Sequence, residues 1–250
     1  MSILILCIYN NTPRNIKLLE IQRQNAVKHN LIDYYFITYD DNMNEEYKLA
    51  NDTLFIKGKE TNMNILDKTI KSLHLFINMK VKKYDFIVRT NISTAFNYNL
   101  LYKYVSELPK NNVYIGGILF KLDWIDECYG ITKQNIKKYS LKHLYYFQGT
   151  CIILSLDVVT FMLDNANKLI HDVVDDVALG LFVKTYLPKA YAYMELIKSI
   201  NFPKCSKLYS IKETSILKTD SVFYRHNSFN DDEDITNMIN TFTQIHSSQC

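Results

Sequence analysis

The sequence has few of the residues that make flexible linkers, with only 6 Gly and 4 Pro among 250 residues. It also has no low-complexity segment and no internal repeat. Its hydrophobic fraction of 48% and charged fraction of 22% are ordinary for a globular protein. A chain of this size and composition suits one large α/β domain over residues 1–250, although two small domains remain an alternative.

Long apolar runs are absent as well. The apolar start of the chain, residues 3–8, lacks a basic flank, is far shorter than a membrane span, and meets Asn10 and Asn11 directly. This pattern predicts a first core strand. We therefore expect no membrane span and a cytoplasmic protein.

The cysteines and the charges exclude further classes of protein. The five cysteines are odd in number and form no CxxC pair, so we expect buried thiols in a reducing compartment at Cys7, Cys128, Cys151, Cys205 and Cys250. The net charge of +3 is spread along the chain without a long basic run. Nucleic acid is therefore not expected as a main partner.

Strand and helix patterns alternate in the first half of the chain, which favours a parallel sheet with crossover helices. The expected strands are 2–9, 33–39, 53–57 and 84–89, and the expected helices are 16–29 and 63–79. The second half is less regular, with strands expected over 113–120 and 145–154, and helices over 156–167, 177–186 and from about 231–234. Ser155 is a candidate N-cap, Pro188 a helix stop, and 123–143 a functional loop or helical insert.

Polar residues follow the expected strands. They are Tyr9 and Asn11 after the first strand, Asp40 after the second, and Arg89, Thr90, Asn91 and Ser93 after the fourth. Ligands of open α/β sheets sit beyond the carboxyl ends of the strands, which makes these residues candidates for binding. Most of these residue types are also common in turns, so each stretch alone fits either role.

An acidic pair opens a helix at Asp175 and Asp176. The partial positive charge of a helix N-terminus favours an ionised carboxylate, which can act as a general base. Gly180 follows one turn later and indicates close approach of another group to this face. The alternative is that one of the two Asp residues only caps the helix.

Four segments, in order, carry a family resemblance. They are YDFIVRTNISTAF (84–96), FQGTCIILSLDVV (147–159), VVDDVALG (173–180) and FYRHN (223–227). Together they resemble motifs of the fringe and β-1,3-galactosyltransferase family of glycosyltransferases. The resemblance covers residues 84–227, whereas over the first 80 residues only the expected topology is similar.

The resemblance implies a GT-A-like α/β fold, in which helices flank a central, mostly parallel sheet and a smaller mixed sheet lies on the acceptor side. It also implies transfer of a sugar from a nucleotide-sugar, expected to be a UDP-sugar, to a hydroxyl of a glycan or glycoprotein with inversion. Residues 1–90 would form the mainly nucleotide-binding half, and residues 91–250 the mainly acceptor-binding and catalytic half.

The family motifs and the strand ends assign a role to each candidate residue. Asp176 matches the catalytic base, and Asp175 would orient substrate or cap the helix. The nucleoside would be held by Tyr9, Asn11 and Asp40. The diphosphate would meet Arg89, Thr90, Asn91, Ser93, Arg225 and His226. The acceptor would meet Gln148, Gly149 and Thr150, and Trp124 and nearby tyrosines could stack on a sugar, although core packing is their commoner role.

The sequence departs from the family at its metal-binding triplet. The family uses an acidic DxD triplet to hold Mn²⁺ or Mg²⁺ against the donor diphosphate, and this chain has Asn91, Ile92 and Ser93 there. Neutral oxygens are weaker ligands, so the metal would be absent, weakly bound, or replaced by cationic side chains. Arg89, Arg225 and His226 are the candidates for replacement.

Three alternatives remain. A nucleotide-sugar-binding protein without catalysis would keep the fold, and a retaining transferase would need no base at Asp176. An interaction module unrelated to sugars would make all four motif matches accidental. Cellular members of the family usually carry a membrane anchor, so this chain is more similar to a cytosolic enzyme of bacteria or large viruses.

Overall fold

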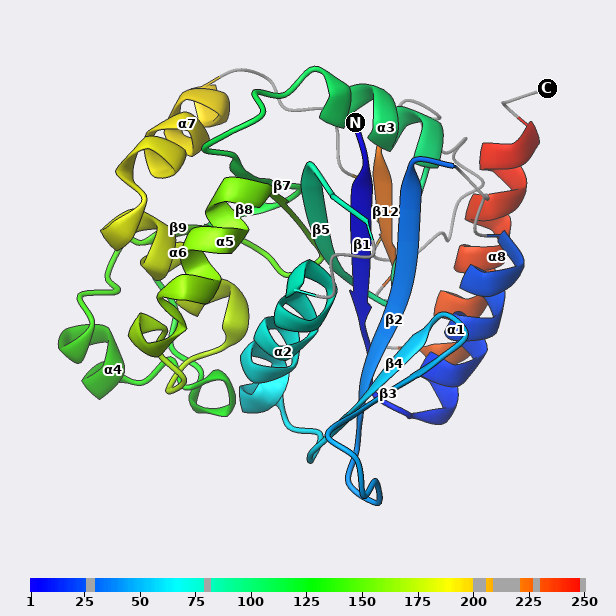
Figure 1. Cartoon of the computed structure of the whole chain (residues 1–250), viewed down its shortest axis with the longest axis horizontal. Coiled ribbons are helices and arrows are strands. Elements are labelled where there is room, and N and C mark those ends of the chain that lie inside the picture. The colour runs from blue at the N-terminus through cyan, green and yellow to red at the C-terminus, as the bar shows by residue number, and fades with distance from the viewer. Residues whose placement is uncertain (26–29, 79–81, 200–205, 209–220, 227–229, 248–250) are drawn as a thin grey trace.

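The centre of the fold is a seven-stranded mixed sheet in the order β3-β4-β2-β1-β5-β10-β7, flanked by helices (Figure 1). The computed structural model describes residues 1–25, 30–78, 82–199, 206–208, 221–226 and 230–247. A seven-stranded sheet with helices around it confirms the α/β class that the alternating patterns predicted.

The strands of the large sheet are β1 (Ile3–Ile8), β2 (Ile32–Asp40), β3 (Tyr47–Ala50), β4 (Thr53–Lys57), β5 (Phe86–Asn91), β7 (Tyr114–Gly116) and β10 (Cys151–Ser155). A three-stranded sheet contains β6 (Thr94–Phe96), β11 (Ser206–Leu208) and β12 (Phe223–His226). A two-stranded sheet contains β8 (Leu119–Lys121) and β9 (Tyr145–Phe147). The α-helices are α1 (Pro13–Asn25), α2 (Ile65–Asn78), α3 (Tyr98–Ser106), α4 (Lys133–Lys138), α5 (Leu156–Asp164), α6 (Asp175–Tyr186), α7 (Pro188–Ser199) and α8 (Asp231–Ser247).

The two crossovers of the first half lie on opposite faces of the sheet. β1 pairs in parallel with β2 on one side and with β5 on the other, and α1 leads toward β2 while α2 leads back toward β5. Since crossovers between parallel strands are right-handed, connections that run in opposite directions put their helices on opposite faces. Figure 1 shows α1 beside α8 on one side of the strands and α2 beside α5 on the other.

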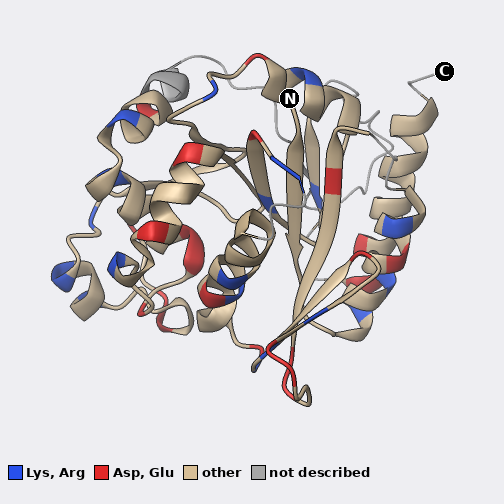
Figure 2. Ribbon diagram, viewed as in Figure 1, with Lys and Arg blue, Asp and Glu red and all other residues tan. Residues whose placement is uncertain are grey.

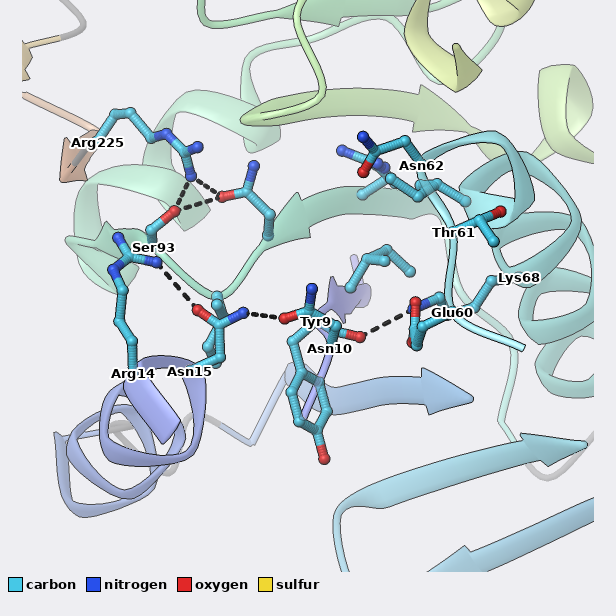
Figure 3. A pocket seen from close by; sticks show the side chains of 15 residues that line it. Tyr9, Asn10, Arg14, Asn15, Glu60, Thr61, Asn62, Lys68, Ser93 and Arg225 are labelled. Carbon is cyan, nitrogen blue, oxygen red and sulfur yellow. Dashed lines mark hydrogen bonds and ion pairs between the residues drawn. The ribbon is translucent and has the colours of Figure 1, made fainter. Parts of the chain in front are cut away.

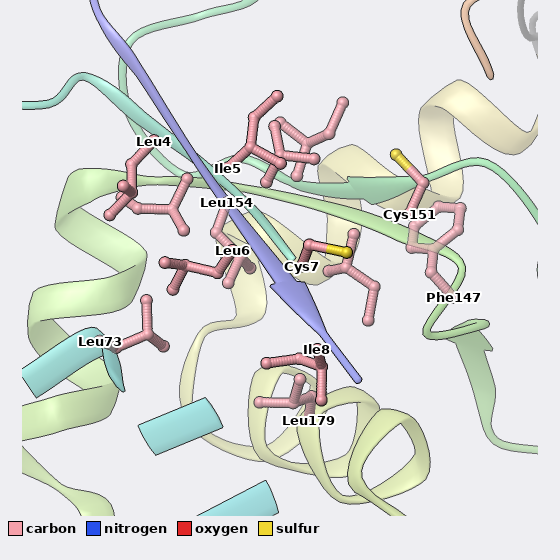
Figure 4. Packing of buried hydrophobic residues seen from close by; sticks show 14 of the residues in the cluster. Leu4, Ile5, Leu6, Cys7, Ile8, Leu73, Phe147, Cys151, Leu154 and Leu179 are labelled. Carbon is pink, nitrogen blue, oxygen red and sulfur yellow. The ribbon is translucent and has the colours of Figure 1, made fainter. Parts of the chain in front are cut away.

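The core is built around β1, whose six residues are all buried. Its continuous apolar sequence, ILILCI, is what a strand covered on both faces requires. Figure 4 shows its side chains packing among residues such as Leu73 of α2, Leu154 of β10 and Leu179 of α6. Each such side chain contributes about 1.5–3 kcal/mol through burial, so β1 fixes the position of the residues that follow it.

Two expected strands are each broken in two. The strand expected at 113–120 divides into β7 and β8, and the one expected at 145–154 divides into β9 and β10. Each break contains a tightly packed glycine. A Cβ added to Gly117 would lie 1.7 Å from the Phe223 ring, and a Cβ added to Gly149 would lie 2.2 Å from the Arg89 guanidinium. At these points the chain leaves the large sheet, and β8 and β9 pair antiparallel in a separate two-stranded sheet.

Several helix boundaries also differ from the expected ones. α1 begins at Pro13, before the expected start at 16, and residues 26–29 of that prediction lie outside the described residues. α6 begins at Asp175, which confirms that the acidic pair opens a helix. Pro188 separates α6 from α7 and begins α7, because its missing N–H is not needed in a first helical turn. The elements that were not predicted are β3, β6, α3, α4, α7, β11 and β12, although α4 lies in the stretch expected to be a loop or helical insert.

Two further expectations need correction. Ser155 occupies the N-cap position of α5 without a capping bond, because its hydroxyl donates to Asp157 (2.6 Å) and accepts from the Val113 amide (2.9 Å). Cys7 and Cys151 are buried thiols as expected, but Cys128 is exposed because it lies in a short helical turn at the surface. Cys205 and Cys250 lie outside the described residues.

Charges of both signs are scattered over the surface elements (Figure 2). A concentration of acidic residues lies at the start of α8, where Asp231 and Asp234 face Arg14 of α1. Among the described residues, no helix is both long enough and apolar enough to cross a membrane.

Replacing Gly180 with Ala tests the close packing of α6 on β9. An added Cβ would lie 2.5 Å from the Cβ of Tyr146, so one of the two elements must shift. We expect the free energy of unfolding to fall by about 1–3 kcal/mol, the usual effect of overpacking, although Ala alone favours a helix by about 1 kcal/mol. Thr185→Ala, at an exposed position of the same helix, is the control and should be neutral or slightly stabilising. Urea denaturation measures both, and an unchanged Gly180→Ala midpoint would contradict the prediction.

Candidate functional site

A cavity of about 320 Å³ opens at the carboxyl ends of β1 and β5. We call it the strand-end cavity, and its lining includes Tyr9, Asn10, Arg14, Glu60, Lys68, Arg89, Asn91, Ser93 and Arg225 (Figure 3). β1 and β5 are neighbours, but their connections leave in opposite directions, so a crevice forms between their ends. Ligands of open α/β sheets bind at such switch points.

Arg225 lies directly on the residues that stand at the family's metal-binding triplet. Its guanidinium donates hydrogen bonds to the Asn91 side-chain oxygen and to the Ser93 hydroxyl. β12 brings it there, because Arg225 pairs with Thr94 of β6, two strands that are far apart in sequence. Burial lowers the pKa of Arg225 to about 10, and the charge of Arg14 acts in the same direction, so the guanidinium is still a cation at neutral pH.

The turn between β5 and β6 is held by Gln22 of α1, whose amide donates to the carbonyls of Thr94 (2.7 Å) and Ile92 (3.3 Å). Gln22 is fully buried. The position of Asn91 and Ser93 therefore depends on a helix about 70 residues earlier, and nothing in the local sequence of Gln22 indicated this role.

Arg89 lies between the strand-end cavity and a second cavity. Its side chain is 4% exposed, donates to the Gly149 carbonyl, and forms a 2.5 Å ion pair with Asp175. Gly149 has no side chain at this point because an added Cβ would overlap the guanidinium. Gly149 lies at the break in the strand expected at 145–154, and the absence of a side chain there leaves room for Arg89.

The second cavity, of about 370 Å³, shares Asn62, Arg89, Asn91 and Arg225 with the first. We call it the aromatic cavity, because one wall consists of Phe120, Trp124, Tyr129 and Tyr146. The lining also contains Gln148, Gly149, Thr150, Asp175 and Asp176. The structure thus brings the two acidic residues and the segment 148–150 together with the guanidinium groups of the strand-end cavity.

Asp176 is held at the edge of the aromatic cavity by two backbone amides. Its carboxylate accepts hydrogen bonds from Gly149 (3.1 Å) and from Val177 (2.8 Å). Burial and the neighbouring charge of Asp175 raise its pKa from 3.8 to about 7, although the amides and Arg89 oppose the shift. The helix N-terminus was expected to keep this carboxylate ionised, but burial outweighs it.

The aromatic wall is anchored to the chain segment just before this acidic pair. The backbone N–H of Val174 donates to the Tyr129 carbonyl (2.9 Å). The side-chain amide of Asn135 donates to the carbonyls of Gly130 (2.9 Å) and Asp172 (3.0 Å). Gly130 adopts φ 69°, and an added Cβ there would lie 2.0 Å from the Asp172 carbonyl. The insert at 123–143 is therefore fixed relative to Asp175 and Asp176.

The residues expected to hold a nucleoside lie in two places. Tyr9 lines the strand-end cavity, and its carbonyl accepts a hydrogen bond from Lys68 (2.8 Å). Asn11 and Asp40 line a neighbouring hollow of about 430 Å³, which shares Asn10 with the strand-end cavity. The hollows at the ends of β1 and β2 therefore adjoin each other.

Two of the expected donor-binding side chains lie elsewhere. Thr90 is fully buried and donates to the Thr150 carbonyl (2.6 Å), so it joins β5 to the segment before β10 and lines neither cavity. His226 is fully buried beneath α8, with its ring nitrogen 3.1 Å from the Thr241 hydroxyl. Burial lowers the pKa of His226 to about 4, so the imidazole is neutral. The assignment of His226 to a diphosphate is corrected, because its side chain faces away from the cavities.

Sequence reasoning missed six polar side chains of the strand-end cavity, which are Arg14, Asn15, Glu60, Thr61, Asn62 and Lys68. Lys68 is 1% exposed and bonds to Glu60, while Arg14 forms a 2.5 Å ion pair with Asp234. Asn62 lines both cavities. These residues belong to helices and a loop rather than to strand ends, so only the tertiary structure identifies them.

The triplet at Asn91, Ile92 and Ser93 does not fit a divalent cation. The oxygens of Asn91 and Ser93 already accept hydrogen bonds from a guanidinium, and a second cation beside Arg225 would be repelled. No cluster of three or more His, Cys, Asp or Glu suited to a metal occurs within the described part of the chain. The groups present favour an anionic ligand instead.

Comparison with known proteins identifies no family. No protein-family model matches the chain, and no curated protein matches it either. The resemblance to glycosyltransferases therefore stays a prediction, and the residues of the two cavities are the remaining evidence for a function.

The raised pKa of Asp176 predicts a pH-dependent effect of Asp176→Asn on stability. Between pH 4 and 7 the unfolded wild type loses a proton that the folded state keeps, so its stability falls as the pH rises. Asn carries no such loss. We expect the variant to melt at least about 2 °C above the wild type at pH 8, with the gap closing toward pH 4. Thermal melts across this range measure it, Asp164→Asn at an exposed site is the control, and a gap independent of pH would contradict the prediction.

Proposed function

We propose that the chain is an inverting glycosyltransferase of GT-A-like fold, which transfers a sugar from a nucleotide-sugar, with a UDP-sugar the expected donor, to a hydroxyl of a glycan. The observation that carries the proposal is the position of Asp176. Its carboxylate lines the aromatic cavity, which shares residues with the cationic strand-end cavity at the ends of β1 and β5. A carboxylate next to a cationic cavity supports the proposal, because the reaction needs a base for the acceptor and an anion-binding surface for the donor.

The donor fits the strand-end cavity. Within the described part of the chain, four cationic side chains line the strand-end cavity, namely Arg14, Lys68, Arg89 and Arg225, against one acidic side chain, Glu60. An excess of positive charge suits a diphosphate. The adjoining hollow with Asn11 and Asp40 supplies polar groups for a nucleoside.

The acceptor fits the aromatic cavity. Trp124 and Tyr129 lie edge to face with ring centroids 6.4 Å apart, and Phe120 stacks with Tyr146 at 6.1 Å. Aromatic rings offer a broad apolar surface to the carbon face of a sugar, while Gln148 and the acidic pair can bind its hydroxyls. A ligand with an apolar face and several hydroxyls would contact both the aromatic rings and the polar residues of this cavity.

In the proposed reaction Asp176 removes the proton of the acceptor hydroxyl while that oxygen attacks the anomeric carbon. The bond from this carbon to the donor phosphate breaks, the configuration inverts, and the nucleoside diphosphate leaves with the electron pair. The guanidinium groups beside the strand ends offset the charge of the leaving group. Asp175 is unsuited to be the base because its carboxylate is ion-paired with Arg89, so it positions the site.

A pKa near 7 suits a general base, since it combines a large ionised fraction at neutral pH with a useful proton affinity. The same carboxylate would have no role as base in a retaining transferase. Activity and its pH dependence therefore distinguish the two mechanisms.

Asp176→Asn tests the proposed chemistry. Donor hydrolysis and transfer should be measured with a panel of UDP-, GDP- and TDP-sugars against simple saccharide acceptors. We expect turnover of the best pair to fall at least about 10²-fold in the variant, the usual effect of losing a general base, with donor affinity unchanged. Turnover of the wild type should rise through an inflection near pH 7, because the base must be ionised.

Asp164→Asn, which changes an exposed carboxylate at the end of α5, is the matched control and should keep full activity. Full activity of Asp176→Asn would refute the role of this residue. No turnover by the wild type with any donor would refute the enzyme assignment.

Tyr129→Ala tests the aromatic wall as an acceptor site. The Tyr129 side chain lines the aromatic cavity, and Tyr186 is equally exposed at 39% but lies at the end of α6, outside the lining. We expect Tyr129→Ala to raise the acceptor KM about fivefold, the effect of losing about 1 kcal/mol of ring contact, and to leave the donor KM unchanged. Tyr186→Ala should change neither constant, and equal effects of the two variants would exclude a binding role for the wall.

A further inference from the structure

Three of the four cations in the strand-end cavity are neutralised by carboxylates. Lys68 pairs with Glu60, Arg14 pairs with Asp234 and more distantly with Asp231, and Arg89 pairs with Asp175. Arg225 is different. Among the described residues it forms no ion pair, and it donates hydrogen bonds to the neutral oxygens of Asn91 and Ser93.

The surroundings of Arg225 oppose its charge. The side chain is partly buried, and burial lowers its pKa together with the charges of Arg14 and Arg89. The charge of Asp234 acts the other way, but that carboxylate is paired with Arg14. A cation that is removed from water without an ion-pair partner of its own, and that lies near like charges, destabilises the folded state. Such a group becomes favourable when an anion binds, because the anion restores the missing counter-charge.

The orientation of Arg225 is set in advance. Asn91 and Ser93 each accept from the same guanidinium nitrogen, and Gln22 holds the turn that carries them. Figure 3 shows Arg225 and Arg14 both beside Ser93 at one end of the cavity. A guanidinium whose direction is fixed can donate its remaining N–H groups to two oxygens of a phosphate.

We infer that the strand-end cavity binds a diphosphate group directly through Arg225, with Arg14 beside it and without a divalent cation. In this arrangement the guanidinium occupies the place where an acidic triplet would hold a metal, and Asn91 and Ser93 orient a cation that belongs to the chain itself. The inference rests on the proposed function only in taking the diphosphate to be that of the donor; the binding event does not require sugar transfer.

Isothermal titration calorimetry with inorganic pyrophosphate and with UDP, in buffer treated to remove metals and containing EDTA, tests the inference. We expect both ligands to bind the wild type under these conditions. Arg225→Gln should weaken binding of each by roughly ten- to a hundredfold, the loss expected for charge-assisted hydrogen bonds. Arg23→Gln removes the same charge from α1 outside the lining of the cavity and should leave both affinities unchanged.

A second measurement excludes a simple folding defect. Without ligand, Arg225→Gln should melt at the same temperature as the wild type or higher, because it removes an uncompensated cation. Pyrophosphate should raise the melting temperature of the wild type and change that of the variant much less. Pyrophosphate binding that requires Mn²⁺ or Mg²⁺, or that is equally tight in Arg225→Gln, would overturn the inference.

The outcome is independent of the test of catalysis. Metal-free binding that depends on Arg225, in a protein that transfers no sugar, would support the inference and refute the proposed enzyme. Sugar transfer that is abolished by EDTA and restored by Mn²⁺, with no pyrophosphate binding in EDTA, would refute the inference and leave the enzyme assignment intact.

Discussion

The strand-end cavity and the aromatic cavity both depend on one buried guanidinium, that of Arg89. It lies between the two cavities, donates to the Gly149 carbonyl, and is ion-paired with Asp175 at 2.5 Å. Burying an unpaired carboxylate such as Asp175 would be strongly unfavourable, so the guanidinium and the acidic helix start can be buried only together. The contact holds three elements in place, which are β5, the segment between β9 and β10, and the start of α6.

The properties of Asp176 follow from this arrangement. The Asp175 carboxylate pairs with Arg89, and its charge adds to the effect of burial in raising the pKa of Asp176. The Gly149 and Val177 amides hold the carboxylate without restoring its usual acidity. Two neighbouring Asp residues thus have different tasks because of what each one touches: Asp175 contacts a cation, and Asp176 faces a cavity.

The same principle distinguishes the cations. Arg14, Lys68 and Arg89 are each committed to a carboxylate, so they shape the strand-end cavity and keep its walls together. Arg225 contacts neutral oxygens and remains ready for an anion. On the other side of Arg89, the aromatic wall is anchored to the segment that leads into α6, so the two halves of the cleft are fixed relative to each other.

The sequence alone determined the α/β class, the buried first strand and the helix opened by Asp175 and Asp176, because each depends on local periodicity or on residues at a helix end. It also placed Asn91 and Ser93 at a strand end and indicated a close approach at Gly180. It did not determine where His226 points or what Arg225 touches, since these depend on strands paired across more than 100 residues. Burial, pKa values and ion pairs arise only when distant segments exclude water together, so only the tertiary structure decided which charged groups are neutralised and which are free to act.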